Sequence, residues 1–268
     1  MSRIKACFSV LKESHKKALI PFITAGDPAP DLTVDLMHEL VAAGADIIEL
    51  GVPFSDPMAD GPVIQRASER ALAQGTNTDD VFNIVEEFRT KNDSTPVILM
   101  GYLNPIEVMG YQHFAEKAVK AGVDGLIIVD LPPEEADELT AVIKPLDLDH
   151  IFLISPTTHG VRLDKISEVA SGFLYYVSLK GVTGSNQLDI GAVSEKLAEI
   201  RSKADLPVGV GFGIRDAQTA EAVGRVSDAV VVGSALVERI AEHAGNNEKM
   251  KKEISSFIGS LRTALDSI

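Results

Sequence analysis

Two acidic residues, Glu49 and Asp60, have the types and spacing to divide acid and base chemistry between them. Glu49 belongs to the apolar run 46–51, where the two-residue period of a strand places it on the opposite face from Ile48 and Leu50. A carboxyl among apolar side chains has a raised pKa, whereas one in a polar loop stays ionised. Such a pair can donate and accept protons within one catalytic cycle.

Each carboxylate also has a structural interpretation. Glu49 could be a buried glutamate paired with a base, although no Lys or Arg stands at a neighbouring strand end to serve as that base. Asp60 lies in the Pro- and Asp-rich loop 53–62 and could cap the helix expected from Pro62. Asp56 precedes a proline and fits an exposed loop tip.

Glycine-bearing turns follow the last two expected strands, at Gly211 to Ile214 and Gly233 to Ala235, each just before a helix. In TIM barrels, turns at these places often form a phosphate site, because exposed backbone N–H groups and a helix N-terminus stabilise an anion without Lys or Arg. The alternative is a pair of tight turns that simply require glycine. The residues therefore indicate a phosphorylated ligand.

A second Gly-bearing loop, Ser178 to Leu188, has the composition of a hinged lid. Lys180 in this loop raises a rival hypothesis, a Schiff-base aldolase, but that chemistry needs a desolvated amine and a Gly-flanked loop exposes it. Tyr102 and Tyr175, near strand ends, fit packing when judged from the residues alone. The histidines show neither His-x-His nor His-Glu-x-x-His spacing, so the sequence does not support metal catalysis.

The elements that must position these residues are short apolar, β-branched runs that alternate with segments of helical spacing. The expected strands are Leu19 to Ile23, Ile47 to Leu50, Val97 to Met100, Gly125 to Val129, Ile151 to Ile154, Phe173 to Val177, Val208 to Val210 and Ala229 to Val232. Eight strand-then-helix units favour closure into a (β/α)8 TIM barrel over an open doubly wound sheet. The second and sixth βα units are the longest, so βα loops 2 and 6 are expected to be extended and to lie on the catalytic face.

Amphipathic stretches flank the barrel pattern at both ends. The stretch Ile4 to Leu11 predicts an extra N-terminal helix, and Ile254 to Leu265 predicts a C-terminal one; we expect both to cap the barrel. No Pro/Ser/Gly-rich linker divides the chain, so residues 1–268 are expected to form a single TIM-barrel domain.

The bulk composition restricts the partners and the compartment. A net charge of -14 argues against binding to nucleic acid or to anionic membranes. The single cysteine, Cys7, leaves no intrachain disulfide and favours the reducing cytoplasm. The sequence has neither the apolar core of a secretory signal nor a membrane-spanning run of about 18 apolar residues.

The run from Glu49 to Pro62, ELGVPFSDPMADGP, resembles the signature of the tryptophan synthase alpha subunit family. Similar segments follow the family's order: PFITAGDP at 21–28, MGYLNPI at 100–106, DLPPEE at 130–135, GVTG at 181–184 and GVGFGI at 209–214. The resemblance extends from about residue 16 to residue 240. It is weaker at Ser185 and Asn186, after the lid's GVTG, and in the tail from Asn246 onward.

This resemblance implies a lyase of tryptophan biosynthesis that cleaves indole-3-glycerol phosphate to indole and D-glyceraldehyde 3-phosphate, a retro-aldol reaction. It implies that Glu49 protonates the indole ring carbon and relays protons from the glycerol hydroxyl, while Asp60 stabilises the indole N–H. By the same resemblance Thr183 closes the lid onto Asp60. The indole pocket would be lined by Phe22, Met100, Tyr102, Val129, Leu153, Tyr175 and Phe212. The phosphate site would comprise Gly184, Gly213, Gly233 and Ser234.

The resemblance also implies a partner, the pyridoxal-phosphate beta subunit, in an alpha2-beta2 heterotetramer, with Asp56, Asn104 and Pro132 near the contact surface. No cofactor is expected on this chain. Two alternatives remain: a stand-alone indole-3-glycerol-phosphate lyase that needs no partner, and a regulatory subunit of little activity. The presence of both Glu49 and Asp60 argues against the second.

Overall fold

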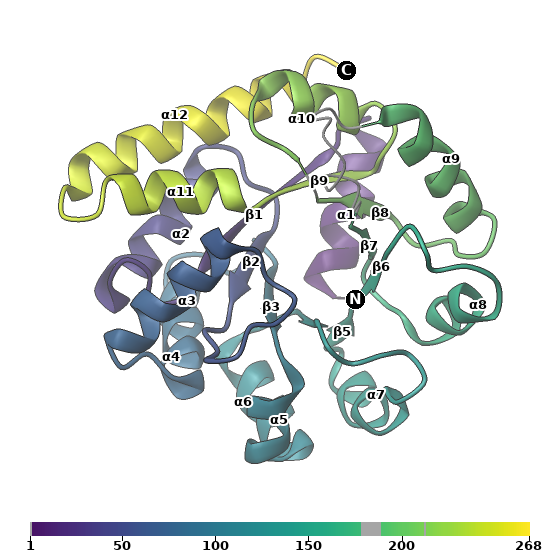
Figure 1. Ribbon diagram of the computed structural model, residues 1–268, viewed down its shortest axis with the longest axis horizontal. Helices are drawn as coiled ribbons and strands as arrows, with labels where there is room; N and C mark the ends of the chain where they lie inside the picture. Colours follow the sequence, from purple (N-terminus) through teal and green to yellow (C-terminus); the bar gives the residue numbers. More distant parts are fainter. Residues whose placement is uncertain (1, 178–188, 212) are drawn as a thin grey trace.

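The computed structural model describes residues 2–177, 189–211 and 213–268, in which a parallel sheet is surrounded by helices (Figure 1). The strand order is β5-β4-β3-β2-β1-β9-β8-β7-β6. Because β5 (Asp149–His150) and β6 (Phe152–Ile154) are separated by Ile151 alone, the two ends of this order are successive pieces of one strand. The sheet therefore closes on itself, and the expected TIM barrel is confirmed.

The remaining strands fall on the expected runs, with ends shifted by at most one residue. They are β1 (Ala18–Thr24), β2 (Ile48–Gly51), β3 (Val97–Gly101), β4 (Gly125–Ile128), β7 (Leu174–Tyr176), β8 (Val208–Val210) and β9 (Ala229–Val232). Strand β1 pairs with β2 on one side and β9 on the other, with Phe22 opposite Glu49 and Pro21 opposite Val232. At the break in the fifth run, the Ile151 N–H still donates to the Leu126 carbonyl at 2.9 Å.

Helices form a ring around the strands (Figure 1). They are α1 (Arg3–Glu13), α2 (Thr33–Ala42), α3 (Pro62–Ala73), α4 (Thr78–Arg89), α5 (Leu103–Met109), α6 (Tyr111–Ala121), α7 (Asp137–Ile143), α8 (Gly160–Val169), α9 (Ile190–Arg201), α10 (Ala217–Gly224), α11 (Ser234–Glu242) and α12 (Asn247–Leu265), with short 3-10 turns η1 (Pro30–Leu32) and η2 (Lys144–Leu146). The second βα unit holds both α3 and α4 after its loop, which accounts for its length. The expected long loop 6 lies outside the described residues.

The two terminal helices behave differently from each other. Helix α1 closes the N-terminal end of the barrel, because Ile4, Phe8 and Leu11 pack with interior residues such as Ile127 and Phe173, as expected. The prediction that the C-terminal helix also caps the barrel is wrong. Helix α12 packs against α2, α10 and α11 in the outer ring (Figure 1). The apolar residues along one face of α12 are buried.

Strand alternation separates an interior core from an outer one. Ile47 and Ile98 belong to the interior cluster, whereas Ile48 and Leu50 pack in the larger cluster beneath the helices. The inward direction predicted for Glu49 follows, because Glu49 shares its face with Ile47. Among the described residues, no helix combines the length and apolarity needed to cross a membrane.

A buried carboxylate ties the N-terminal face together. Asp124, 4% exposed, accepts hydrogen bonds from Arg3 of α1 at 2.9 Å, from Arg89 of α4 at 2.7 Å and from the backbone N–H of Val97 at 2.8 Å. Desolvation lowers the pKa of Arg89, and the Asp124 charge opposes that shift. One side chain thereby joins α1, α4 and the start of β3.

Replacing Asp124 with Ala should lower the free energy of unfolding by about 3–5 kcal/mol, because a buried arginine loses its counter-charge. Urea unfolding measures the loss. A matched control is Asp79→Ala, which breaks the exposed Lys117–Asp79 pair and should cost about 1 kcal/mol or less. Equal losses in the two variants would contradict a stabilising role for the Asp124 network.

Candidate active site

Glu49 lies near the carboxyl end of β2 with its side chain inside the barrel. It is 1% exposed, and its Oε2 atom has no hydrogen-bond partner among the described residues. Burial raises the pKa of this carboxyl to about 8, and the nearby Asp60 charge contributes to the shift. Glu49 is therefore largely protonated at neutral pH, which is the state of a proton donor.

A pocket of about 380 Å³ opens over Glu49 at the carboxyl ends of the strands. Such a volume suits a small phosphorylated molecule, and this end of the barrel is where TIM-barrel enzymes carry out their chemistry. The lining residues are Phe22, Glu49, Asp60, Ile64, Met100, Tyr175, Gly211, Gly213, Ile214, Arg215, Val231, Gly233, Ser234, Ala235 and Glu238. Glu49 and Asp60, eleven positions apart in the chain, thus face one cavity.

Asp60 is half-buried on the loop between β2 and α3. Its Oδ2 accepts a hydrogen bond from the Tyr102 hydroxyl at 3.0 Å, and that hydroxyl accepts one from the Ala59 N–H at 3.0 Å. Burial raises the pKa of Asp60, and the Tyr102 hydrogen bond opposes that rise. Helix α3 has Gly61 as its N-cap, and no side-chain hydrogen bond caps the helix. The helix-capping interpretation of Asp60 is therefore wrong.

The position of this loop is fixed by helix α3, which begins at Pro62. Arg70, two turns further along α3, makes a bidentate ion pair with Asp27 after β1, at 2.7 and 2.9 Å. Asp27 is 1% exposed; burial raises the pKa of its carboxyl, and the Arg70 pair opposes that rise. Because the guanidinium fork fits one carboxylate orientation, the pair locks α3 to the barrel.

Tyr175 of β7 lines the same pocket as Glu49 and Asp60. Burial raises the pKa of its hydroxyl well above the ordinary value, and the Glu49 charge adds to this shift, so the phenol stays neutral. Gly211 makes room for it, since a Cβ at that position would stand 2.2 Å from the Tyr175 hydroxyl. Tyr102 and Tyr175 fit packing when judged from the residues alone, whereas the resemblance placed them in the indole pocket. Both belong to the surroundings of the two carboxylates.

The far end of the pocket is built from backbone. Gly213 adopts a positive φ of 72°, and Gly233 is the N-cap of α11 with Ser234 as its first helical residue. The N–H groups of Ser234 and Ala235 precede the first intrahelical donor, Leu236, so they are available to an anion. This end of the pocket can therefore bind a phosphate group.

Several other predicted residues do not line this cavity: Val129 and Leu153 were expected in the indole pocket, and Asp56, Asn104 and Pro132 at the partner contact. Val129, Leu153 and Pro132 line a neighbouring pocket of about 330 Å³ rather than the cavity over Glu49. Asp56 and Asn104 are exposed, on loop 2 and on α5. Outside the described residues are Lys180, Thr183, Gly184 and Phe212.

Four lining residues were not predicted from the sequence as part of the site: Ile64, Arg215, Val231 and Glu238. Periodicity could have found two of them. Glu238 follows Ser234 by four residues, one helical turn, and Val231 lies two positions before Gly233 on the same strand face. Arg215 directly follows the Gly211 to Ile214 turn. The glycine pattern that predicted this turn does not predict a cation beside it.

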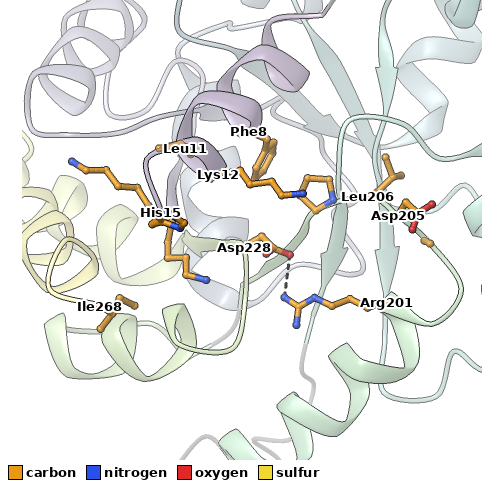
Figure 2. A pocket seen from close by; sticks show the side chains of 13 residues that line it. Phe8, Leu11, Lys12, His15, Arg201, Asp205, Leu206, Asp228 and Ile268 are labelled. Atoms are coloured by element: carbon orange, nitrogen blue, oxygen red, sulfur yellow. Dashed lines mark hydrogen bonds and ion pairs between the residues drawn. The ribbon is translucent and has the colours of Figure 1, made fainter.

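A larger pocket, about 630 Å³, opens at the opposite, N-terminal face of the barrel. Figure 2 shows it between Phe8, Leu11 and Lys12 of α1 and the turn with Asp205 and Leu206. Two of its cations stabilise the fold. Lys17 donates to the Ser227 carbonyl, and Arg201 donates to Asp228, the contact dashed in Figure 2. Neither Glu49 nor Asp60 reaches this pocket.

The fold and the cavity define a (β/α)8-barrel enzyme with a paired-carboxylate site and a backbone anion site. The family model of the tryptophan synthase alpha chain matches residues 8–266. The chain belongs to this family. It is 58% identical to the tryptophan synthase alpha chain of Nitrosococcus oceani, covering 100% of this chain and 98% of that one. It is 59% identical to that of Cupriavidus metallidurans, covering 100% of both.

Solved structures agree with the sequence relatives. The chain resembles the crystal structure of the tryptophan synthase alpha subunit from Legionella pneumophila with a TM-score of 0.94, at 48% identity and 100% coverage of both chains. A chain from a Mycobacterium tuberculosis tryptophan synthase structure gives a TM-score of 0.88, at 34% identity and 99% coverage of both. The family expected from the motifs is therefore confirmed.

Glu49→Gln should make folding more stable at neutral pH. The pKa of Glu49 rises from 4.5 to about 8 on folding, so its contribution to stability is full below 4.5 and declines as pH rises towards 8. The variant does not titrate there, and its advantage over the wild type should grow by roughly 1.4 kcal/mol per pH unit within that window. Urea unfolding of both proteins at several pH values measures this difference in the free energy of unfolding. Glu253→Gln, at an exposed position, should give a flat difference, and a flat result for Glu49→Gln would refute the burial argument.

Arg70→Met should lower kcat roughly tenfold or more while leaving KM nearly unchanged, since a misplaced Asp60 weakens the reaction more than it weakens binding. Steady-state kinetics measures both, and Arg70→Lys should restore part of kcat. Arg66→Met, at an exposed position one turn earlier on α3, is the matched control. A loss of stability in Arg70→Met with normal kcat would show that the Asp27 pair supports the fold alone.

Proposed function

We propose that Glu49 and Asp60 carry out the cleavage of indole-3-glycerol phosphate to indole and D-glyceraldehyde 3-phosphate. This lyase reaction is that of the tryptophan synthase alpha chain, the family to which the chain belongs. The observation that carries the assignment of residues is the buried Glu49 carboxyl, with its pKa near 8, in the same pocket as Asp60. A donor with a pKa close to the working pH is well suited to general acid–base catalysis.

The reaction needs one proton, which Glu49 donates and then recovers from the substrate. Glu49 donates its proton to the indole ring carbon that bears the glycerol chain, and the positive charge that results is shared with the ring nitrogen. The glycerol hydroxyl on the adjoining carbon then loses its proton to Glu49. As its carbonyl forms, the carbon–carbon bond breaks and its electron pair restores the aromatic ring. Glu49 ends protonated, so no external acid or base is consumed.

Asp60 stabilises the charge that develops in this sequence. An ionised carboxylate that accepts a hydrogen bond from the indole N–H lowers the energy of the protonated ring. The Tyr102 hydroxyl supports this role, because its hydrogen bond favours ionised Asp60. Phe22, Met100 and Tyr175, which line the pocket beside the carboxylates, supply the apolar surroundings that an indole ring requires.

The phosphate group would bind at the opposite end of the pocket. Gly213, Gly233 and Ser234 support this assignment, because the α11 N-terminus offers N–H groups to an anion. The expected contributions of Gly184 and of the lid residue Thr183 stay predictions, as do those of Phe212, Val129 and Leu153 to the indole pocket.

The chain acts with a beta subunit, as tryptophan synthase alpha chains do, and the pyridoxal phosphate of the complex belongs to that subunit. Two exposed apolar side chains support a contact at the catalytic face: Met58 on loop 2 is 79% exposed and Val108 on α5 is 82% exposed. Asp56 and Asn104 lie on the same two elements. Exposed apolar groups beside polar ones are typical of a protein interface.

We also propose that residues 1–268 work as one TIM-barrel domain in the cytoplasm. One closed sheet with a continuous outer core supports the first point, and the single cysteine suits a reducing compartment. A Schiff-base aldolase that uses Lys180 is not favoured, because the family relationship points to Glu49 and Asp60 instead.

The decisive experiment assays indole release from indole-3-glycerol phosphate by the pure chain, with and without a beta subunit. Glu49→Gln should reduce kcat by at least 10²-fold and Asp60→Asn by a smaller but clear factor, because each loses one proton or charge role. Lys180→Met is the control and should retain a competent site, without trapping of substrate by borohydride. Near-normal turnover in Glu49→Gln would refute the mechanism.

A further inference from the structure

The anion end of the pocket contains a cation that the backbone site does not account for. Arg215 lines the pocket together with Gly213, Gly233 and Ser234. Its main chain is fixed, because its N–H donates to the Thr219 hydroxyl at 3.0 Å. The next residue, Asp216, forms the capping box that starts α10. Arg215 is exposed, and its side chain extends from a fixed main chain at the rim of the pocket.

The charges around the pocket oppose an anionic ligand. Among the residues that the structure describes, its charged lining consists of Glu49, Asp60, Glu238 and Arg215, three acids and one base, in a chain of net charge -14. Of these lining acids, Glu238 lies one turn along α11 from Ser234. A phosphate dianion bound at the α11 N-terminus is therefore close to a carboxylate that repels it.

We infer that Arg215 is a specificity-determining residue that selects the phosphorylated end of the substrate and offsets Glu238. The inference rests on the function proposed above and deepens it. The planar guanidinium matches phosphate oxygens and keeps its charge at every working pH. Backbone N–H groups give the site its shape, and Arg215 adds a positive charge beside the acids that line the described part of the pocket.

Phosphate binding and catalysis therefore depend on different residues. Arg215 follows β8, on the side of the barrel where the glycine turns lie, whereas Glu49 and Asp60 act from β2 and its loop. Loss of the guanidinium should weaken the phosphate contact equally in the bound substrate and in the transition state. Such uniform binding changes KM and leaves kcat alone.

The test measures inhibition by inorganic phosphate and steady-state kinetics of indole release, in the full chain with its beta subunit. Arg215→Gln should raise the KM for indole-3-glycerol phosphate and the inhibition constant of phosphate by roughly 5- to 30-fold, the loss of one charge-assisted hydrogen bond at an exposed site, with kcat within about twofold. Arg215→Lys should recover part of the binding, and Glu238→Gln should tighten phosphate.

Arg225→Gln is the matched control, since Arg225 is exposed next to α10 and pairs with Glu221 away from the pocket. It should leave both constants unchanged. Equal phosphate inhibition in Arg215→Gln, Arg225→Gln and the wild type would overturn the inference while the proposed function stood. A wild-type chain that releases no indole would instead refute the proposed function.

Discussion

The burial of the Glu49 carboxyl inside an apolar barrel is the constraint on which the other parts of the site depend. The interior layers consist of residues such as Ile47, Ile98 and Val231, and none of them can solvate a charge. The carboxyl accordingly holds its proton up to a pKa of about 8, with an Oε2 atom that no described residue satisfies. An ion pair at this place would keep the carboxyl ionised and would remove the proton donor.

Asp60 needs the opposite environment, and a different part of the scaffold provides it. It lies on a loop rather than a strand, with a hydroxyl donor in Tyr102 and partial access to solvent. A loop alone would hold it loosely. The Arg70–Asp27 pair connects α3 to the segment after β1, so the loop is anchored by a helix that is itself fixed to the barrel. Strand β2 positions Glu49, and helix α3, fixed by its ion pair with Asp27, positions Asp60.

Periodicity predicted the parts of this arrangement that depend on local pattern. Strand alternation turned Glu49 inward, and repeated strand–helix units closed the sheet. Contacts between distant residues were not predictable: the Asp60 partner lies 42 positions away at Tyr102, and Arg70 reaches back 43 positions to Asp27. Amphipathicity likewise revealed that one face of α12 is buried but not which surface buries it. Chemistry-bearing residues could be named from their types, whereas their partners required the folded chain.

Helix α1 gives the barrel a closed floor, because Phe8 and Leu11 fill its base with apolar side chains. Within the part of the chain that the structure describes, the pocket over Glu49 lies at the catalytic mouth and not at this base. Once a substrate occupies that mouth, Glu49 faces the substrate and exchanges its proton with it. The indole product must also leave in the direction from which its precursor came. Any protein that receives indole directly must sit over the mouth of the barrel.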